Sequence, residues 1–295
     1  MKNKKFRYGL MGVATVGVLS MMTYASSKMA DTLMKRQNSD KNTKEPHCFD
    51  DAKLVHVMNS EHQLLCGYYY ENNSDLTIIV MHPYNLSAKA MMSYIRYFTH
   101  NFNCNILAVD ILNHGSSDGN VHQLGFSDDI VCWVNYLIGS HHENIILFGK
   151  EMGANAILNN TKVLKSIKQV KGIISDGAYT SVKEVLNYRL QKDYYILKFP
   201  FVGLMKWIVK WRYHIDIDEL DTIKQIEKNT IPTLFVHTQK DVFVPMKQVF
   251  KLYNALQAKK ELLVLKGETY LFDLENKPHD GYLNTLSRFI KECTD

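Results

Sequence analysis

The feature that most constrains the fold of this chain is the pair of glycines, Gly149 and Gly153, on either side of Glu151. The apolar run 144–148 precedes this pair, and the helix-like stretch 154–160 follows it. Glycine tolerates backbone conformations and close approaches that other residues avoid. The segment therefore predicts a strand that passes through a sharp turn into a helix, with Glu151 at the tip of the turn.

Short apolar runs alternate with amphipathic stretches over the rest of the chain. The predicted strands are 62–70, 76–82, 104–110, 145–148, 172–176, 233–237 and 261–265. The predicted helices are 87–100, 126–138, 152–160, 245–256 and 282–293. This alternation is typical of a mostly parallel sheet that is covered by helices on both faces. We therefore expect an α/β fold.

One long interval, 181–230, interrupts the alternation and is rich in aromatic residues. Ligands of open α/β sheets bind at the carboxyl ends of the strands. The interval therefore predicts a helical lid over that edge, with Phe199, Phe201, Trp207 and Trp211 as its aromatic residues. Ordinary connecting helices are one alternative, and an aromatic surface that touches a bilayer is another.

The first residues of the chain have the pattern of a membrane segment. Four basic residues between positions 2 and 7 precede an uncharged run, 8–27. A helix of about 20 residues crosses a bilayer, and a basic flank favours a cytoplasmic N-terminus. The predicted parts are therefore a signal-anchor at 1–34, a polar linker at 35–46 and a folded domain at 47–295. This arrangement predicts a single-pass protein of the cell membrane, with its domain outside the cytoplasm.

A cleaved signal peptide is the competing interpretation of the same segment. Thr23, Tyr24 and Ala25 form a passable small-residue cleavage site. Cleavage there would release a secreted protein.

Charge and cysteine content exclude other classes of function. The net charge is +5, but four of the basic residues lie before residue 8, so the remaining chain is nearly neutral. Nothing in that balance indicates a nucleic-acid surface. The five cysteines lack the spacing of a metal site. We expect neither a metal nor a cofactor.

Four further segments accompany the glycine turn in a fixed order. They are 80–84, reading Val-Met-His-Pro-Tyr; 110–119, containing His-Gly-Ser; 175–181, beginning Ser-Asp-Gly; and 231–245, in which Asp241 follows a Val-His pair. Together with the glycine turn, they resemble the exported, membrane-anchored bacterial α/β-hydrolases of the serine-aminopeptidase and lipase-like type. The resemblance covers roughly 54–290. It implies an α/β-hydrolase fold in which Gly149 and Gly153 bracket the nucleophile elbow.

The resemblance also implies positions for a catalytic triad, and two of the three are altered. In this fold a nucleophilic serine precedes an acid, and a histidine comes last. Glu151 stands at the serine position, Asp241 at the acid position and Tyr270 at the histidine position. His279 follows nine residues later and is the alternative base.

The oxyanion hole implied by the resemblance would use two backbone N–H groups. One belongs to Met152, directly after the elbow residue, and the other belongs to Tyr84, in the loop after a strand. Pro83 replaces the glycine that the family usually has beside this hole. We hypothesise that the carboxylate of Glu151 folds into the hole and fills it.

These changes bear directly on function. A serine nucleophile needs a base to take its proton, and a tyrosine, with an unperturbed pKa of about 10, is poorly suited to that role. We therefore expect an exported pseudo-serine hydrolase that binds a small apolar or peptide-like ligand, or a partner protein. The alternatives are an active ester or amide hydrolase with unconventional residues, acting on peptides or lipid-like compounds, and a scaffolding surface protein with a filled pocket. A glutamate nucleophile would be one form of the first alternative.

Overall fold

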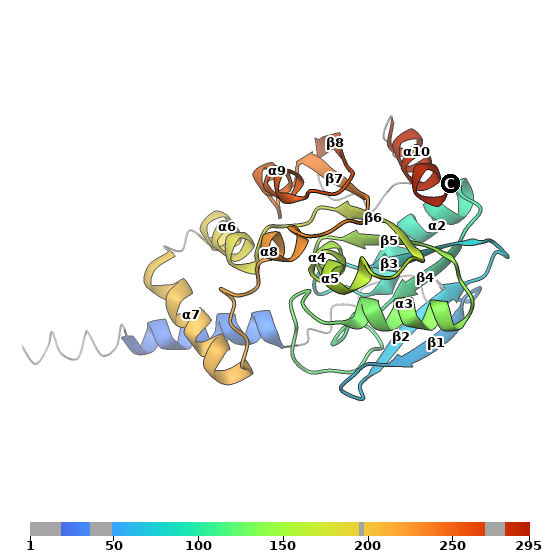
Figure 1. Cartoon of the computed structure of the whole chain (residues 1–295). Coiled ribbons are helices and arrows are strands. Elements are labelled where there is room, and N and C mark those ends of the chain that lie inside the picture. Colours follow the sequence, from blue (N-terminus) through green and yellow to red (C-terminus); the bar gives the residue numbers. More distant parts are fainter. Residues whose placement is uncertain (1–18, 36–48, 195–197, 269–280) are drawn as a thin grey trace, which may run out of the picture.

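The predicted strands assemble into one twisted sheet (Figure 1). The computed structural model describes residues 19–35, 49–194, 198–268 and 281–295. Within these ranges the strands are β1 (Lys53–Met58), β2 (Leu64–Tyr70), β3 (Leu76–Met81), β4 (Asn105–Val109), β5 (Asn144–Lys150), β6 (Val170–Asp176), β7 (Thr233–Lys240) and β8 (Lys260–Glu268). Their order across the sheet is β1-β2-β4-β3-β5-β6-β7-β8. The pairs β1–β2 and β2–β4 are antiparallel and the other pairs of these strands are parallel, so the prediction of a mostly parallel sheet is confirmed.

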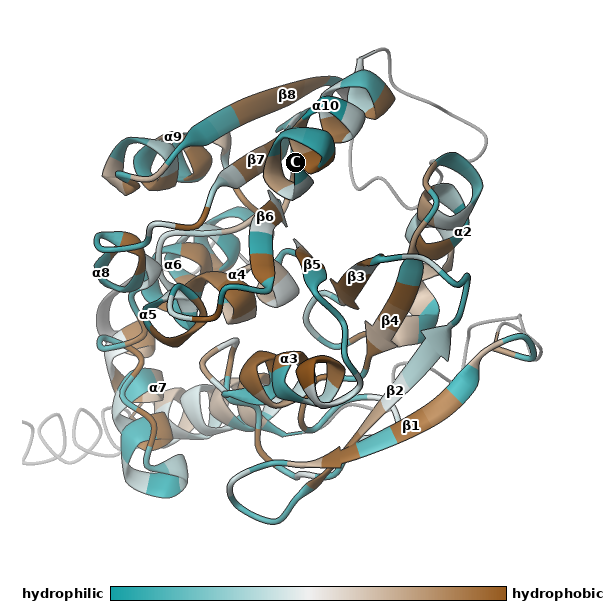
Figure 2. Cartoon of the chain, turned by 45° about the vertical axis from the view of Figure 1, so that its right-hand side comes forward, coloured by the Kyte–Doolittle hydropathy of each residue, from teal (hydrophilic) through white to brown (hydrophobic). Residues whose placement is uncertain are grey.

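Helices cover both faces of this sheet. They are α2 (Met92–Asn101), preceded by the 3₁₀ turn η2 (Ala88–Met91), α3 (Asp129–Gly139), α4 (Met152–Asn159), α5 (Thr161–Leu164), α6 (Val182–Tyr194), α7 (Lys198–Tyr213), α8 (Thr222–Ile226), α9 (Met246–Ala255) and α10 (Tyr282–Thr294). One apolar core joins the sheet to α3, α4, α5, α8 and α9, and a second joins the opposite face to α2 and α10. Figure 2 shows hydrophobic residues concentrated along β3, β4 and α3.

Strand β5 illustrates why the sheet needs both layers of helices. Alternate side chains of a strand point to opposite faces of the sheet. Ile145 and Leu147 accordingly lie in the first core, whereas Ile146 and Phe148 lie in the second. All four are fully buried. A continuous apolar run of this kind is stable only when helices cover both faces.

A third apolar cluster lies at the carboxyl ends of the strands. It includes Tyr179, which follows β6, and Val244, which follows β7. Packed against them are Val182 of α6 and the α7 residues Met205, Ile208 and Val209. The described part of the interval 181–230 therefore contains three helices, α6, α7 and α8, and α6 and α7 cover a section of this edge.

A helix over residues 19–34 belongs to the same cluster. Its side chains Ala30 and Met34 are fully buried there, and in Figure 1 the helix runs beside α7. Asp31 accepts hydrogen bonds from Arg212 Nη1 at 2.6 Å and from the Tyr213 hydroxyl at 2.5 Å. In the described ranges no helix combines the length and the apolar character that crossing a membrane requires. Residues 1–18 of the predicted signal-anchor, and 36–46 of the predicted linker, lie outside those ranges.

Candidate active site at the carboxyl edge of the sheet

The turn between β5 and α4 holds Glu151 in a strained backbone conformation. Its φ is 50° and its ψ is −111°. Residues other than glycine rarely have positive φ, and such strain persists only where the surroundings fix it. Two hydrogen bonds do so: the Glu151 N–H donates to the Asp176 carbonyl at 2.7 Å, and the Glu151 carbonyl accepts from the Asn155 N–H at 3.0 Å. The elbow is therefore hydrogen-bonded to β6 through the Glu151 N–H and to α4 through the Glu151 carbonyl.

Both flanking glycines are required by close backbone approaches. A Cβ at Gly149 would lie 2.5 Å from the Ala154 nitrogen, because α4 folds back over the end of β5. A Cβ at Gly153 would lie 2.5 Å from the carbonyl oxygen of Met81, because α4 also crosses the end of β3. The two glycines thus set the geometry of the turn, whichever side chain occupies its tip.

Asp241 lies at the same edge, just beyond β7. Its Oδ1 accepts hydrogen bonds from the N–H groups of Phe243 at 2.7 Å and Val244 at 2.9 Å. A Cβ on Gly177, the first residue after β6, would lie 3.8 Å from Asp241 Oδ2. One carboxylate oxygen therefore stabilises its own loop, and the other faces the turn after β6. Tyr270 and His279, the two residues considered for the histidine position, lie outside the described residues.

Two tyrosines experience the charge of Glu151. Burial raises the pKa of Tyr84 above its ordinary value, and the negative charge of Glu151 raises it further. The pKa of Tyr179 is raised in the same way, by burial first and then by Glu151. The two phenols therefore stay neutral beside the elbow carboxylate.

Tyr84 also links the loop after β3, where one oxyanion N–H is predicted, to the N-terminal helix. Its hydroxyl donates to the carbonyl of Leu33 at 2.8 Å and approaches the carbonyl of Thr32 at 3.3 Å. The carbonyl of Met34 accepts from the His122 N–H at 2.8 Å. Carbonyls in the last turn of a helix have no intrahelical partner. The Tyr84 hydroxyl and the His122 N–H donate hydrogen bonds to two of these carbonyls. The loop after β3 is thereby held against a segment some fifty residues earlier in the chain.

The buried histidine after β3 is committed to the backbone. His82 Nδ1 donates to the Pro83 carbonyl at 2.7 Å, and Nε2 accepts from the Ile111 N–H at 3.0 Å. These partners assign the neutral tautomer. Burial lowers the pKa of His82 to about 4. A ring bound in this way is a structural element and not a proton acceptor for substrate.

His114 is committed in the same manner. Its Nδ1 donates to the Leu112 carbonyl at 3.0 Å, and its Nε2 accepts from the Asn85 N–H at 3.3 Å. The His114 ring packs edge-on against His82 with centroids 5.0 Å apart. These two histidines therefore brace the loops beside the elbow.

A buried ion pair lies next to the elbow, and sequence reasoning did not identify it. Lys150 Nζ contacts Asp176 Oδ1 at 2.8 Å, and both side chains are at most 2% exposed. The Tyr94 hydroxyl donates to the other carboxylate oxygen at 3.0 Å. The available signal was a lysine closing an otherwise apolar strand, since such a residue needs a buried partner.

The aromatic residues predicted for the lid differ in how far they are exposed on α7. Phe201 is half-buried, and its carbonyl accepts from Ser26 Oγ at 3.4 Å. Trp207 and Trp211 are 60% and 66% exposed, and neither belongs to the third apolar cluster at the edge of the sheet. The side chain of Phe199 is outside the described part. Among the described residues, no group of three or more acidic, histidine or cysteine side chains could hold a metal ion.

Comparison with known proteins supports the same architecture. No family model matches the chain. It is 23% identical over 291 residues to the uncharacterized protein YqkD of Bacillus subtilis (strain 168), and the match covers 96% of this chain and 94% of that protein.

Solved structures show the likeness in three dimensions. The Pyrococcus furiosus esterase Pf2001 is 18% identical, with a TM-score of 0.70, and the match covers 89% of this chain and 99% of that chain. Est1E from Butyrivibrio proteoclasticus, solved with ferulic acid, is 16% identical with a TM-score of 0.59, over 81% of this chain and 96% of that one. The α/β hydrolase GrgF from Penicillium sp. sh18 is 17% identical with a TM-score of 0.59, over 82% and 98%. The protein therefore has the α/β-hydrolase fold.

Proposed function

We propose that this α/β-hydrolase-fold protein has lost serine-hydrolase catalysis and binds a small apolar or peptide-like ligand, or a partner protein, at the carboxyl edge of its sheet. The observation that carries the proposal is the elbow itself. The position that presents a nucleophilic serine in this fold presents Glu151, at φ 50°. Without a serine hydroxyl, the elbow cannot form the acyl-serine intermediate.

The surroundings of Glu151 support the loss of catalysis. His82 and His114, which lie beside the elbow, have both ring nitrogens bound to backbone groups. Asp241 Oδ1 is engaged by its own loop. The family resemblance places Tyr270 at the position of the catalytic histidine, with His279 as the alternative base. A nucleophile at this elbow would therefore lack the usual base.

The retained geometry favours binding over a purely scaffolding role. Strain of the kind seen at Glu151 costs on the order of 1–3 kcal/mol, and it is typical of functional sites. The cluster of α6, α7 and helix 19–34 above this edge is apolar, so a ligand that enters between these helices and the elbow would meet apolar side chains.

An active hydrolase with a carboxylate nucleophile is the second candidate, and the strained elbow also favours it. Attack of the Glu151 carboxylate on the acyl carbon of an ester would expel the alcohol or phenol and form a mixed anhydride, and water would then hydrolyse that anhydride. Turnover of p-nitrophenyl butyrate in H₂¹⁸O would leave ¹⁸O in the Glu151 carboxylate when water attacks the glutamyl carbonyl of the anhydride, and mass spectrometry of the peptide detects this label. Hydrolysis accompanied by such labelling would establish this candidate, whereas we expect neither.

We also propose that the uncharged run 8–27 attaches the protein to the cell membrane, with its domain outside the cytoplasm. The basic flank supports that orientation. Cleavage after Ala25 would remove the exposed residues Leu19, Met21 and Tyr24 and would leave the buried Ser26, Ala30 and Met34 on the domain. A secreted protein is therefore the alternative, and fractionation of cells that produce the wild-type protein separates the two.

Restoring the missing groups tests the proposed loss of catalysis. We expect Glu151→Ser alone to give little esterase activity, because no base accompanies the new hydroxyl. Glu151→Ser together with Tyr270→His should give measurable hydrolysis of p-nitrophenyl butyrate. Tyr270→His alone is the matched control and should remain inactive. Full activity of the single serine variant would show that a base is already in place and that the assignment of Tyr270 is wrong.

A further inference from the structure

Helix α7 presents two different faces. Met205, Ile208 and Val209 are buried in the third apolar cluster, which also includes residues of helix 19–34. The outward face carries Trp207 and Trp211, which are 60% and 66% exposed. Residues four apart lie on the same side of a helix. The two rings are accordingly parallel, with an interplanar angle of 1° and centroids 6.1 Å apart.

An exposed pair of tryptophans is unusual on a surface that meets only water. Tryptophan carries a large apolar ring and a single N–H donor, so it favours boundaries between apolar and aqueous regions. Contiguous exposed apolar groups generally mark a place where a protein meets a partner or a membrane. The pair on α7 is therefore a candidate contact surface.

The N-terminal helix indicates what this surface contacts. Leu19, Met21 and Tyr24 at its start are 57%, 75% and 66% exposed. The uncharged run 8–27 includes these residues and continues for eleven positions before Leu19. A bilayer that accepts the run 8–27 would thus include or adjoin this exposed aromatic and apolar stretch. Leu19 to Tyr24 spans only about 8 Å of helix at 1.5 Å per residue.

The contacts between α7 and the N-terminal helix keep Trp207 and Trp211 near the surface of the proposed bilayer. Asp31 of the N-terminal helix binds Arg212 and Tyr213 at the end of α7. Ser26 binds the carbonyl of Phe201 near the start of α7. Because α7 is fixed to the N-terminal helix at both ends, its outward face moves with the membrane-attached segment.

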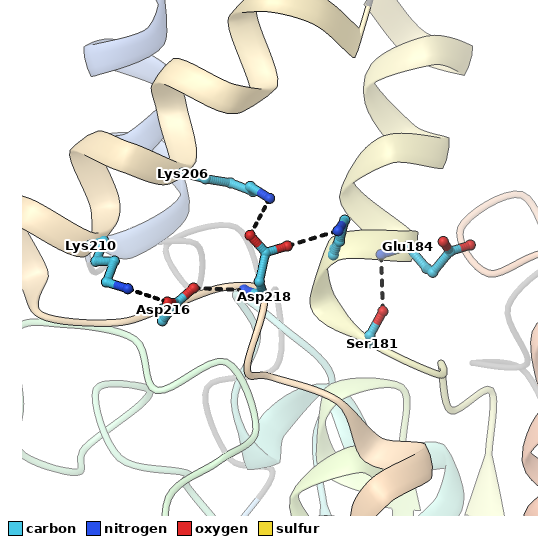
Figure 3. Close-up of polar contacts among 7 residues, drawn as sticks. Ser181, Glu184, Lys206, Lys210, Asp216 and Asp218 are labelled. Carbon is cyan, nitrogen blue, oxygen red and sulfur yellow. Dashed lines mark hydrogen bonds and ion pairs between the residues drawn. The ribbon is translucent and has the colours of Figure 1, made fainter.

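The charges of α7 indicate which region of the bilayer the surface contacts. Lys206 and Lys210 reach from α7 to Asp218 and Asp216, as Figure 3 shows. Asp216 pairs with Lys210, whereas Asp218 is shared between Lys206 and Lys183 of α6. The lysines beside the tryptophans are thus held in ion pairs, and the surface is more aromatic than cationic. It suits the boundary between headgroups and acyl chains, where tryptophan is enriched. Its binding should depend little on anionic lipid or on salt.

We propose that Trp207 and Trp211 insert into the interfacial layer of a lipid bilayer and hold the lid helix α7 against the membrane. The proposal rests on the proposed membrane attachment of the run 8–27. It places the apolar cluster above the carboxyl edge next to the lipid phase. An apolar ligand could then pass from the bilayer to the site without crossing water.

The tryptophan content of the chain allows a direct test. The chain has three tryptophans, and the third, Trp133, is fully buried in the sheet core. The full chain is reconstituted into phosphatidylcholine vesicles whose acyl chains carry bromine close to the headgroup. We expect bromine to quench most of the tryptophan emission in the wild-type protein, at low and at high salt. In the variant Trp207→Phe with Trp211→Phe, the remaining emission from Trp133 should be unaffected by bromine.

Flotation of the same samples tests membrane attachment separately from the insertion of Trp207 and Trp211. Wild-type protein that floats with the vesicles but is not quenched would overturn the insertion of Trp207 and Trp211, and would leave membrane attachment standing. Protein that does not float would overturn both. Quenching that persists in the double Phe variant would also contradict the proposal, because it would come from Trp133.

Discussion

The hydroxyl of Tyr84 donates to the carbonyl of Leu33 at 2.8 Å and so joins the loop after β3 to the last turn of the N-terminal helix. The same loop supplies the backbone N–H that would form half of an oxyanion hole. A segment that the sequence assigns to a membrane anchor therefore stabilises the candidate site. The position of this loop at the candidate site therefore depends on the N-terminal helix as well as on the sheet.

Removing this hydroxyl should destabilise the protein modestly. A single hydrogen bond contributes about 1 kcal/mol net, so we expect Tyr84→Phe to lower the melting temperature by a few degrees. Circular dichroism of the full chain in detergent measures the change. Tyr24→Phe is the matched control, because Tyr24 is 66% exposed, and it should melt like the wild type. Identical melting of the two variants would show that the contact between Tyr84 and Leu33 adds nothing to stability.

The elbow glycines should tolerate no side chain. A Cβ at Gly153 would meet the Met81 carbonyl oxygen at 2.5 Å, so Gly153→Ala must displace α4 or β3. We expect a loss of several kcal/mol in urea unfolding, as for an overpacked core. Gly203→Ala in α7 is the control, since a Cβ there meets nothing within 4 Å. It should raise stability by about 0.5–1 kcal/mol, because alanine favours helix. A stable Gly153→Ala protein would contradict the tight crossing of α4.

The buried pair of Lys150 and Asp176 should be costly to break on one side. Lys150→Met leaves a buried carboxylate without its cation, and we expect it to cost about 3–5 kcal/mol. Adding Asp176→Asn removes the second charge and should recover part of that loss. Lys259→Met, which breaks the exposed pair with Glu292, should change stability little. If the double variant is less stable than Lys150→Met alone, the two charges do not act as a pair.

Stability should fall on acidification through the range in which His82 titrates. Burial holds its pKa at about 4, below the ordinary 6.5, so the unfolded chain binds the proton first as the pH falls. Folding is therefore favoured above pH 6.5, and up to about 3 kcal/mol is lost between pH 6.5 and 4. Asp129, whose pKa burial raises to about 6, acts in the opposite direction.

A variant that does not titrate isolates the contribution of His82 to the pH dependence of stability. His82→Gln keeps a donor for the Pro83 carbonyl and an acceptor for the Ile111 N–H, but it does not titrate. We expect its free energy of unfolding, measured in urea between pH 7 and pH 4, to fall less steeply than that of the wild type. Parallel curves would show that His82 is not held neutral by burial.

Features encoded locally were predictable, and those made by distant contacts were not. Gly149 and Gly153 reveal a sharp turn because the constraint acts on the backbone itself. Strand β1 was missed because only Val55 in it is buried, which leaves almost no apolar pattern at this edge of the sheet. The pairing of Lys150 with Asp176 depends on the register between β5 and β6, which no local pattern encodes.

The N-terminal helix shows a second limit of sequence reasoning. An apolar run has the same composition whether it faces lipid or protein. Ala30 and Met34 pack on α7 because of where the chain returns after residue 198. The outward direction of Trp207 and Trp211 likewise follows from which face of α7 the N-terminal helix covers.

Reaction of the full chain with a fluorophosphonate probe tests the central claim most directly, because the probe bonds only to an activated serine. Intact mass spectrometry measures the adduct, and a known serine esterase treated in parallel shows that the probe is active. Since the elbow presents Glu151 in place of serine, we predict no adduct on the wild-type protein. A stoichiometric adduct would contradict the loss of serine-hydrolase catalysis.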